Sequence, residues 1–490
     1  MLPTDPNLEM DFTLESEKSG VIDDPAFQML ILGDWSADGS KHDVERRKAI
    51  EVDRDNFDDV MNGLGVKLDL DLIDSRITLD FRSLDDFHPD ELFKRLPQFA
   101  ELRELRKRLR NSDTFNSAAR EVREWLQPGT PTVEPAAAEV PAASDNLLDA
   151  ILAQPEGGAT APKPAISSDI SKLISEVVRP HLVGVDENEQ SAMVAAVDDA
   201  TSALMRTILH DRRFQLLEAA WRGLFFLVRR TDTGSDLRLY ILDLTKDELA
   251  EDVKSEQAIL KQIAAGRNGD PFAAVFGNYA FAPSVDDVAA LIRIGKAAAA
   301  GRTPFVSHMR PEVLGIASLT DHHDPDDWDL SGTGTEGKLW AALRDQPESQ
   351  FVGLTLPRFL ARLPYGSETE PAETFSFEEF TDDSGHDDYL WANGCFAVAL
   401  LLGQTYSEFG WEFGQRFMQD VSGLPLHVYK QDGQSVYQSC AEVQLSQNAA
   451  EELADHGLMP IVSFKNMDQI RLTRFQSISD PGKGLKGRWK

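Results

Sequence analysis

Residues 127–166 are dominated by proline, alanine and glycine, as in PGTPTVEPAAAEVPAA and QPEGGATAPKPA. A stretch of this composition has too few large apolar side chains to build a core, and its prolines stiffen it. One short apolar island, DNLLDAILAQ, interrupts it and is compatible with a small docking helix. We therefore expect a linker here, which divides the chain into an N-terminal module at 25–126 and a larger unit at 167–490.

The first 24 residues carry seven acids and one base, Lys18. Because this segment is acidic and lacks an apolar periodicity, we expect residues 1–24 to form a disordered acidic tail. It also lacks the apolar run of a secretory signal, and the longest apolar run elsewhere, CFAVALLLG at 395–403, is too short to span a bilayer. We therefore expect a cytoplasmic protein without membrane insertion.

The N-terminal module shows both strand and helix patterns. Apolar residues predict strands at 27–32 and 50–52, a helix at 57–64 closed by Gly65, a hairpin at 66–81 turning at Asp74-Ser75, and a helical stripe at 92–109 divided by Pro97. In the larger unit, helical patterns alternate with the strand-like runs LRLYILDLT, PFAAVFGNYAF and TPFVSHM. This alternation predicts an α/β (α+β) fold in which helices flank mixed sheets.

Charge and cysteine content exclude some functions. Acids outnumber bases 82 to 49, a net charge of −33. Since affinity for phosphate comes mainly from Lys and Arg, such a surface repels nucleic acid and anionic membranes. The two cysteines, Cys395 and Cys440, cannot form a disulfide framework and fit a reducing compartment.

One stretch has the spacing of a phosphate-binding loop. SGTGTEGKLW places Gly332, Gly337 and Lys338 in the order G-x-x-x-x-G-K. Such a loop follows a buried strand and has Ser or Thr after the lysine, whereas here the acidic run DPDDWDL precedes it and Leu339 follows. We interpret the spacing as coincidence and expect no nucleotide or other cofactor.

Other candidate sites are equally weak. The loop DHHDPDDWD at 321–329 offers histidines and carboxylates, but without the spacing of a metal-binding helix, so we expect a solvated acidic loop and no metal. Cys395 lies in an apolar run where a thiolate is costly, and no nucleophile elbow is present. We expect no catalytic residue and no enzymatic activity.

Several long motifs resemble a known family. QFVGLTLPRFLARLPYGSETEPAETFSFEEF, EAAWRGLFFLVRRTDTG and GLMPIVSFKNMDQIRLTRFQSISDP are similar to the large sheath subunit of the bacterial type VI secretion system, the TssC family, in its ImpD- or EvpB-like variant. The resemblance runs from about residue 170 to the end. AIEVDRDNFDDVMNGLGVKLDLDL and FRSLDDFHPDELFKRLPQFAELRELRKRL resemble the small sheath subunit, TssB, over about 25–125.

The resemblance implies a structural component of a contractile injection apparatus. Its partners would be copies of itself or other sheath subunits, an inner tube protein, baseplate components and an AAA+ ATPase that dismantles the sheath. Because both modules lie on one chain, a non-polymerising accessory, cap or baseplate-proximal adaptor remains an alternative. A phosphate-loop nucleotide hydrolase is the third and weakest hypothesis.

The motif residues have structural rather than chemical roles under this hypothesis. Those that carry the resemblance are Arg82, Asp85, Asp86, Phe87, Trp221, Pro357, Arg358, Phe359, Arg362, Pro364, Tyr365 and Trp391. We expect Trp221 and Phe359 in the core, and Arg358 and Arg362 paired with acids such as Glu370 or Glu378. The basic C-terminus is either an interface for an acidic neighbour or a frayed end; its candidate residues are Arg488, Trp489 and Lys490.

Overall fold

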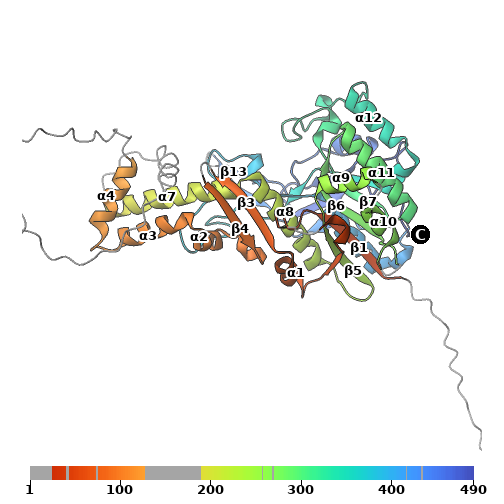
Figure 1. Cartoon of the computed structure of the whole chain (residues 1–490). Helices are drawn as coiled ribbons and strands as arrows, with labels where there is room; N and C mark the ends of the chain where they lie inside the picture. Colours follow the sequence, from red (N-terminus) through yellow and green to blue (C-terminus); the bar gives the residue numbers. More distant parts are fainter. Residues whose placement is uncertain are drawn as a thin grey trace, which may run out of the picture.

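The computed structural model of the chain describes residues 25–39, 43–72, 75–126, 189–255, 258–267, 270–414, 416–431 and 434–489. The expected tail at 1–24, the expected linker at 127–166 and Lys490 lie outside these ranges, as does the apolar island within the linker. Figure 1 shows the described part as a sheet-containing body from which a group of helices projects.

Within the described ranges, nine strands form one sheet in the order β11-β15-β14-β8-β7-β6-β1-β5-β2. Neighbouring strands from β14 to β5 are parallel, while β2, β15 and β11 each run antiparallel to a neighbour. The mixed α/β class expected from the sequence is confirmed. The strands are β1 (Phe27–Gly33), β2 (Ile50–Val52), β5 (Leu237–Asp243), β6 (Ala274–Phe281), β7 (Phe305–Met309), β8 (Val352–Leu356), β11 (Asp420–Ser422), β14 (Met459–Ser463) and β15 (Gln469–Leu472).

Three two-stranded pairs lie outside this sheet. They are β3 (Val66–Leu72) with β4 (Ser75–Phe81), β9 (Phe359–Leu360) with β10 (Trp391–Ala392), and β12 (His427–Gln431) with β13 (Gln434–Gln438). The first is the hairpin predicted at 66–81. Leu72 pairs with Ser75, so Ser75 belongs to β4 and not to the predicted turn, while residues 73–74 lie outside the described ranges.

Local sequence signals explain several helix boundaries. Gly65 closes α1 with φ of 62°, a left-handed conformation that glycine adopts at little cost. Pro97 stands between α2 and α3, as predicted. The helices are α1 (Phe57–Leu64), α2 (Pro89–Arg95), α3 (Gln98–Arg110), α4 (Phe115–Leu126), α7 (Glu189–Leu209), α8 (Arg212–Arg230), α9 (Lys246–Ser255), α10 (Ala258–Ala265), α11 (Val285–Gly301), α12 (Thr335–Arg344), α13 (Gly394–Phe409) and α14 (Gln447–Asp455), with short 3-10 turns η1 (Val44–Arg46), η2 (Leu84–Phe87), η4 (Pro311–Leu314), η5 (Pro325–Asp327), η6 (Pro347–Phe351), η7 (His386–Asp388) and η8 (Gly410–Glu412).

Both faces of the sheet are buried, and strand β1 shows why its sequence is continuously apolar. Met29 and Ile31 point into the cluster shared with α8 and α13, whereas Leu30 and Leu32 point into the cluster shared with α9, α10 and α11. A parallel strand covered by helices on both faces needs apolar residues at every position. The run FQMLILG, buried along its whole length, meets that requirement.

The N-terminal segment does not have a sheet of its own around β1. Strand β1 pairs in parallel with β5 on one side and with β6 on the other, both of which come from beyond residue 236. At the opposite end of the molecule, α3 and α4 pack with α7 to form the projecting helical arm (Figure 1). Residues 25–126 therefore contact the rest of the chain both in the sheet and in the arm.

Candidate functional site: an interlock between two chain segments

The strongest candidate for a functional arrangement is the set of contacts between residues 25–126 and residues 189–489, here called the interlock. Its first element is Asp243, the last residue of β5. The Oδ1 atom accepts hydrogen bonds from the backbone N–H groups of Trp35 (2.8 Å) and Ser36 (3.1 Å), and Oδ2 accepts from the Ser36 hydroxyl (2.6 Å). The carboxylate is buried, so these bonds fix the end of β1 beside β5.

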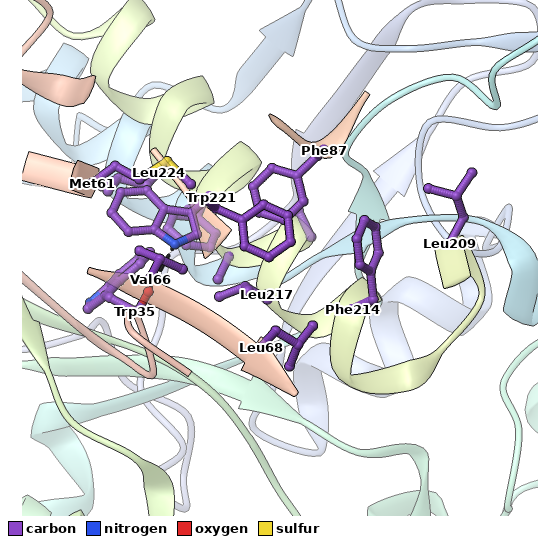
Figure 2. Packing of buried hydrophobic residues seen from close by; sticks show 14 of the residues in the cluster. Trp35, Met61, Val66, Leu68, Phe87, Leu209, Phe214, Leu217, Trp221 and Leu224 are labelled. Atoms are coloured by element: carbon purple, nitrogen blue, oxygen red, sulfur yellow. Dashed lines mark hydrogen bonds between the residues drawn. The ribbon is translucent and has the colours of Figure 1, made fainter. Parts of the chain in front are cut away.

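An aromatic group surrounds Trp35, and Figure 2 shows the Trp35 and Trp221 side chains next to each other. The indole N–H of Trp221, on α8, donates to the carbonyl of Trp35 (3.0 Å), and the two rings meet edge to face at 5.4 Å. Phe57 of α1 packs on the same indole, with ring centroids 5.6 Å apart. Trp221 is fully buried, which confirms its prediction as a core residue.

An ion pair adds a third contact near β1. Arg47 donates two hydrogen bonds to the Glu248 carboxylate (2.7 and 2.9 Å) and one to the carbonyl of Asp243 (2.8 Å). Burial acts to raise the pKa of Glu248, but the hydrogen bonds from Arg47 and Thr245 outweigh it, and the pKa is lowered. The carboxylate is therefore held in its charged form by the N-terminal segment.

The motif residues 82–87 form a turn that carries one aromatic anchor. Asp86 accepts hydrogen bonds from the backbone N–H groups of Arg82 (2.6 Å) and Ser83 (3.2 Å), whereas the side chains of Arg82 and Asp85 are exposed. The fully buried ring of Phe87 packs edge to face against Phe214 of α8, 5.6 Å away. Only part of this motif therefore reaches the other segment.

Asp90 holds a loop of the larger segment. Its two carboxylate oxygens accept hydrogen bonds from the backbone N–H groups of Glu373 (2.9 Å) and Thr374 (3.0 Å), and the Thr374 hydroxyl donates to it as well. Burial acts to raise the pKa of Asp90, but these bonds outweigh it and the pKa is lowered. Nothing in the local sequence singles out Asp90, because its only signal is that of an ordinary helix start.

In the helical arm, one arginine joins the two segments. Arg106 of α3 binds both carboxylate oxygens of Asp198 on α7 (2.5 and 3.0 Å). Next to them the rings of Phe93 and Phe375 lie 4.7 Å apart. The Arg106–Asp198 ion pair is partly buried, so this basic residue of α3 makes a specific contact with the second segment.

A buried ion cluster lies where the resemblance motif LPRFLARLPYG meets α8. The Arg362 guanidinium binds Glu218 of α8 (2.7 and 3.2 Å) and Glu379 (2.7 and 3.1 Å). The expected partners of Arg362, Glu370 and Glu378, are therefore wrong. Both belong to the exposed outer side of the loop, whereas a buried guanidinium needs carboxylates that reach inward.

Tyr365 completes this ion cluster. Arg222 donates to its hydroxyl (2.7 Å), the Arg362 guanidinium lies over its ring at 4.2 Å, and its backbone N–H donates to Glu379 (2.7 Å). Burial acts to raise the pKa of Glu379, but Arg362 and the His210 side chain outweigh it and lower the pKa to about 2. The Glu379 carboxylate is therefore ionised at neutral pH.

The other motif residues of this region have structural contacts. Arg358 binds Glu442 through Nε (3.0 Å) and Nη2, not the acids expected from the sequence. Phe359, 1% exposed, packs on Phe226 at 5.2 Å, which confirms it as a core residue. The remaining positions are Pro357 at the end of β8, Pro364, whose carbonyl accepts from the Thr369 hydroxyl, and Trp391, whose indole N–H donates to the His386 carbonyl (3.0 Å).

The C-terminal residues are engaged within the chain. Arg488 donates to the carbonyl of Pro271 (2.7 Å) and lies over the Trp411 ring at 5.2 Å. Trp489 packs on Phe413 and Phe475, with ring centroids 5.2 and 5.9 Å apart. Through residue 489 the terminus is docked on the molecule and not frayed.

The structure places the G-x-x-x-x-G-K stretch and the acidic loop at 321–329 in settings that differ from those of a phosphate-binding loop and a metal-binding helix. The G-x-x-x-x-G-K stretch enters α12 from a loop, and within the described range 270–414 the element directly before it is the 3-10 turn η5; Lys338 is exposed. In the acidic loop, His322 approaches Asp327 at 3.7 Å, but no group of three or more potential metal ligands gathers within the described ranges. In the same part of the chain, no helix is long and apolar enough to cross a bilayer.

Comparison with known proteins agrees with this picture. The profile of the VipB family, described as EvpB/VC_A0108, tail sheath N-terminal domain, matches residues 191–479. A second profile, described as type VI secretion system, VipA, VC_A0107 or Hcp2, matches residues 5–128. The type VI secretion system sheath protein TssC1 of Pseudomonas aeruginosa is 35% identical over 305 residues, which cover 59% of this chain and 61% of that protein. The chain thus spans about three fifths of the length of this curated relative.

The matches define a structural class of protein rather than an enzymatic one, and the fold and the interlock are consistent with that class. The resemblance seen in the sequence is confirmed. The chain belongs to the VipB tail sheath family and carries a VipA-type segment at its N-terminus.

Proposed function

We propose that this chain is a cytoplasmic sheath subunit that assembles, with copies of itself or with other sheath subunits, around the inner tube of a contractile injection apparatus. The observation that carries the proposal is the position of β1. A strand from the VipA-type segment completes the central sheet of the VipB-type segment, so the two together make one building block. In such a protein, free energy is stored in packing between subunits and not in a reactive centre.

The division of the chain follows from the same proposal. We assign residues 1–24 to a disordered acidic tail, 25–126 to the small-subunit module, 127–166 to a linker and 167–490 to the large-subunit core. The motif residues serve to hold the interlock and the adjoining core, and the buried ones, such as Phe87 and Arg362, bear most of that role. Baseplate components, the inner tube protein and an AAA+ ATPase are the further partners; nucleic acid is not one.

A second candidate function is a non-polymerising accessory that caps or docks on a sheath. It is favoured by the fact that the interlock is closed within one chain. The arm brings the two segments together, because Gln190 at the start of α7 donates to the Leu109 carbonyl of α3 (2.8 Å). Because both modules belong to one polypeptide, each is held at a high effective concentration near the other. A polymer built from such closed chains would need contacts between chains in addition to the interlock.

Negative-stain electron microscopy of the purified chain distinguishes the two functions. The chain is imaged alone and mixed with separately expressed sheath subunits. Long striated tubes formed by the chain support the sheath subunit. Discrete particles bound only at the ends of tubes made by other subunits support the accessory function. Particles that bind no sheath component contradict both proposed functions. Samples at low and high salt test whether charge matching contributes to assembly, since the chain is strongly acidic.

A further inference from the structure

The central part of the sheet has a topology with a known consequence for ligand binding. Five of the parallel strands, β5-β1-β6-β7-β8, have the order 2-1-3-4-5 when they are numbered along the chain, and β14 follows β8 at the far side. In doubly wound sheets of this order, ligands bind beyond the carboxyl ends of the strands, at the switch point between the first strand and the third. Here that point lies between the ends of β1 and β6.

A cavity of about 930 Å³ occupies this position. It is lined by Asp34, which follows β1, by Lys246 after β5, by Asn278 and Tyr279 in β6, and by His308 in β7. The first turns of α8 form another wall. Its volume falls in the range typical of binding sites for small molecules or for side chains.

The cavity wall contains polar atoms that have no hydrogen-bond partner among the described residues. His308 is 4% exposed, and its Nδ1 atom has no hydrogen-bond partner within the described ranges; the same is true there of Oε2 of Glu312. Both residues line the cavity. Buried polar atoms without partners are rare because each costs free energy, so they indicate a missing partner.

Asp34 adds a carboxylate at the switch point. The residue is exposed but lies among other acids, and partial burial of its carboxylate, together with the carboxylates of Asp243, Glu248 and Asp38, raises its pKa to about 6. Because these neighbours are also acids, a cation placed in the cavity would relieve a cost that the free protein bears.

Most cations of the lining are already paired. Lys246 binds Asp287 and the Ala280 carbonyl, and Arg358 binds Glu442. Arg213 binds Asp38. The other two cations of the lining, Arg212 and Arg310, are exposed. Their charges are therefore screened by solvent and do not replace a cation within the cavity.

We propose that this cavity is a binding site for a guanidinium or ammonium group, which would donate hydrogen bonds to Asp34 and Glu312. Leu216 of α8 lies on the lining with 58% of its surface exposed. A polypeptide that supplies the cation would also cover this leucine with apolar surface, which a free polyamine does not offer, so we commit to a cationic side chain of another polypeptide. Arginine suits the site because its planar group offers several donors at once. The inference goes beyond the proposed function and does not depend on assembly.

The test uses the full chain and two probes, agmatine and N-acetyl-leucyl-arginine amide, titrated by calorimetry. We expect both to bind, and the Asp34→Asn and Glu312→Gln variants each to weaken binding by about tenfold or more. Asp199→Asn, which changes an exposed acid in the middle of α7 far from the lining, should leave both affinities unchanged. Thermal melts establish that each variant is folded.

The two probes separate the sources of the cation. If the dipeptide binds about fivefold or more tightly than agmatine, and Leu216→Ala removes that advantage, the ligand is a protein side chain. If agmatine binds equally well, the ligand is a free small cation. The proposal is overturned if neither probe binds at concentrations of several millimolar, or if folded Asp34→Asn and Glu312→Gln variants both bind as wild type does.

Discussion

The Oδ1 atom of Asp243 accepts a hydrogen bond from the backbone N–H of Trp35 at 2.8 Å, although the two residues are 208 positions apart in the chain. The contact joins the end of a strand supplied by the VipA-type segment to the end of its neighbour in the VipB-type segment. Since the strand on the other side of β1 also belongs to the second segment, removing β1 would separate β5 and β2 from the other six strands of the sheet. The two segments therefore depend on each other for a complete core.

Asp243→Ala is expected to destabilise the interlock strongly. The change leaves the buried N–H groups of Trp35 and Ser36 without their acceptor, and each unsatisfied group costs about 1–3 kcal/mol. We expect a loss of about 2–4 kcal/mol in the free energy of unfolding, measured by urea denaturation followed by tryptophan fluorescence. The matched control is Asp199→Ala, which removes an exposed aspartate. Equal stability of the two variants would mean that Asp243 does not hold β1.

Arg362→Ala is expected to cost about 3–5 kcal/mol, because it leaves Glu218 and Glu379 buried without their shared cation. Arg362→Lys should recover only part of the loss, since an ammonium group cannot bind both carboxylates in the same paired geometry. Differential scanning fluorimetry gives the order of the melting temperatures. Arg293→Ala, at an exposed position of α11, serves as the control and should melt like wild type. A melting temperature for Arg362→Ala equal to that control would contradict the structural role of the cluster.

Acidic pH should reduce the stability that the ion cluster around Arg362 contributes. The pKa of Glu379 is lowered to about 2 from an ordinary value of 4.5, so its contribution to stability is complete above about pH 4.5 and is lost as the pH falls towards 2. We expect wild type to lose more stability than Glu379→Gln between about pH 5 and pH 3, because the variant has already lost that carboxylate. Parallel denaturation curves at several pH values measure the difference. Identical pH dependence in the two proteins would contradict the assignment.

The contribution of Asp34 to stability should depend on pH in the opposite direction from that of Glu379. Its pKa is raised to about 6, so the folded state binds a proton more readily than the unfolded state and this residue lowers stability as the pH rises from about 4 to about 6. Asp34→Asn should therefore stabilise the free chain above about pH 6 by on the order of 1 kcal/mol, a value reduced because solvent reaches the side chain, and should change little at about pH 4. Melting curves at both pH values test this. A destabilised variant at neutral pH would show that the carboxylate makes a favourable contact instead.

Cutting the chain between its two segments should leave them associated. A protease site inserted within 127–166 is cleaved, and the two products are passed over a size-exclusion column. We expect a single peak that contains both, because β1 lies between β5 and β6 and because Arg106 binds Asp198 in the arm. Separation under native conditions would show that the interlock is too weak to act without the linker. Asp243→Ala, cleaved in the same way, should separate more readily.

Much of the architecture was predictable because its signals are local. The continuous apolar run of β1, the alternation of the hairpin at 66–81 and the position of Pro97 each report on their own surroundings, and the resulting elements were predicted within a few residues. The family resemblance was predictable for a different reason, since long motifs keep their order along the chain. The acids of the interlock, Asp90 and Asp243, and those of the buried ion cluster, Glu218 and Glu379, were not found, because they look like any other carboxylate among 82 acids.

The sequence by itself determined which stretches become strands and helices, and that the chain resembles a sheath protein, because periodicity, turn residues and motif order are properties of neighbouring residues. Only the tertiary structure decided that β1 enters the middle of a sheet built by a later segment, that Arg362 pairs with Glu218 and Glu379, and that a cavity opens beside Asp34. The physical reason is that strand partners, buried ion pairs and cavities depend on which surfaces meet after the chain has folded. Residues hundreds of positions apart supply those surfaces, and no local pattern identifies them.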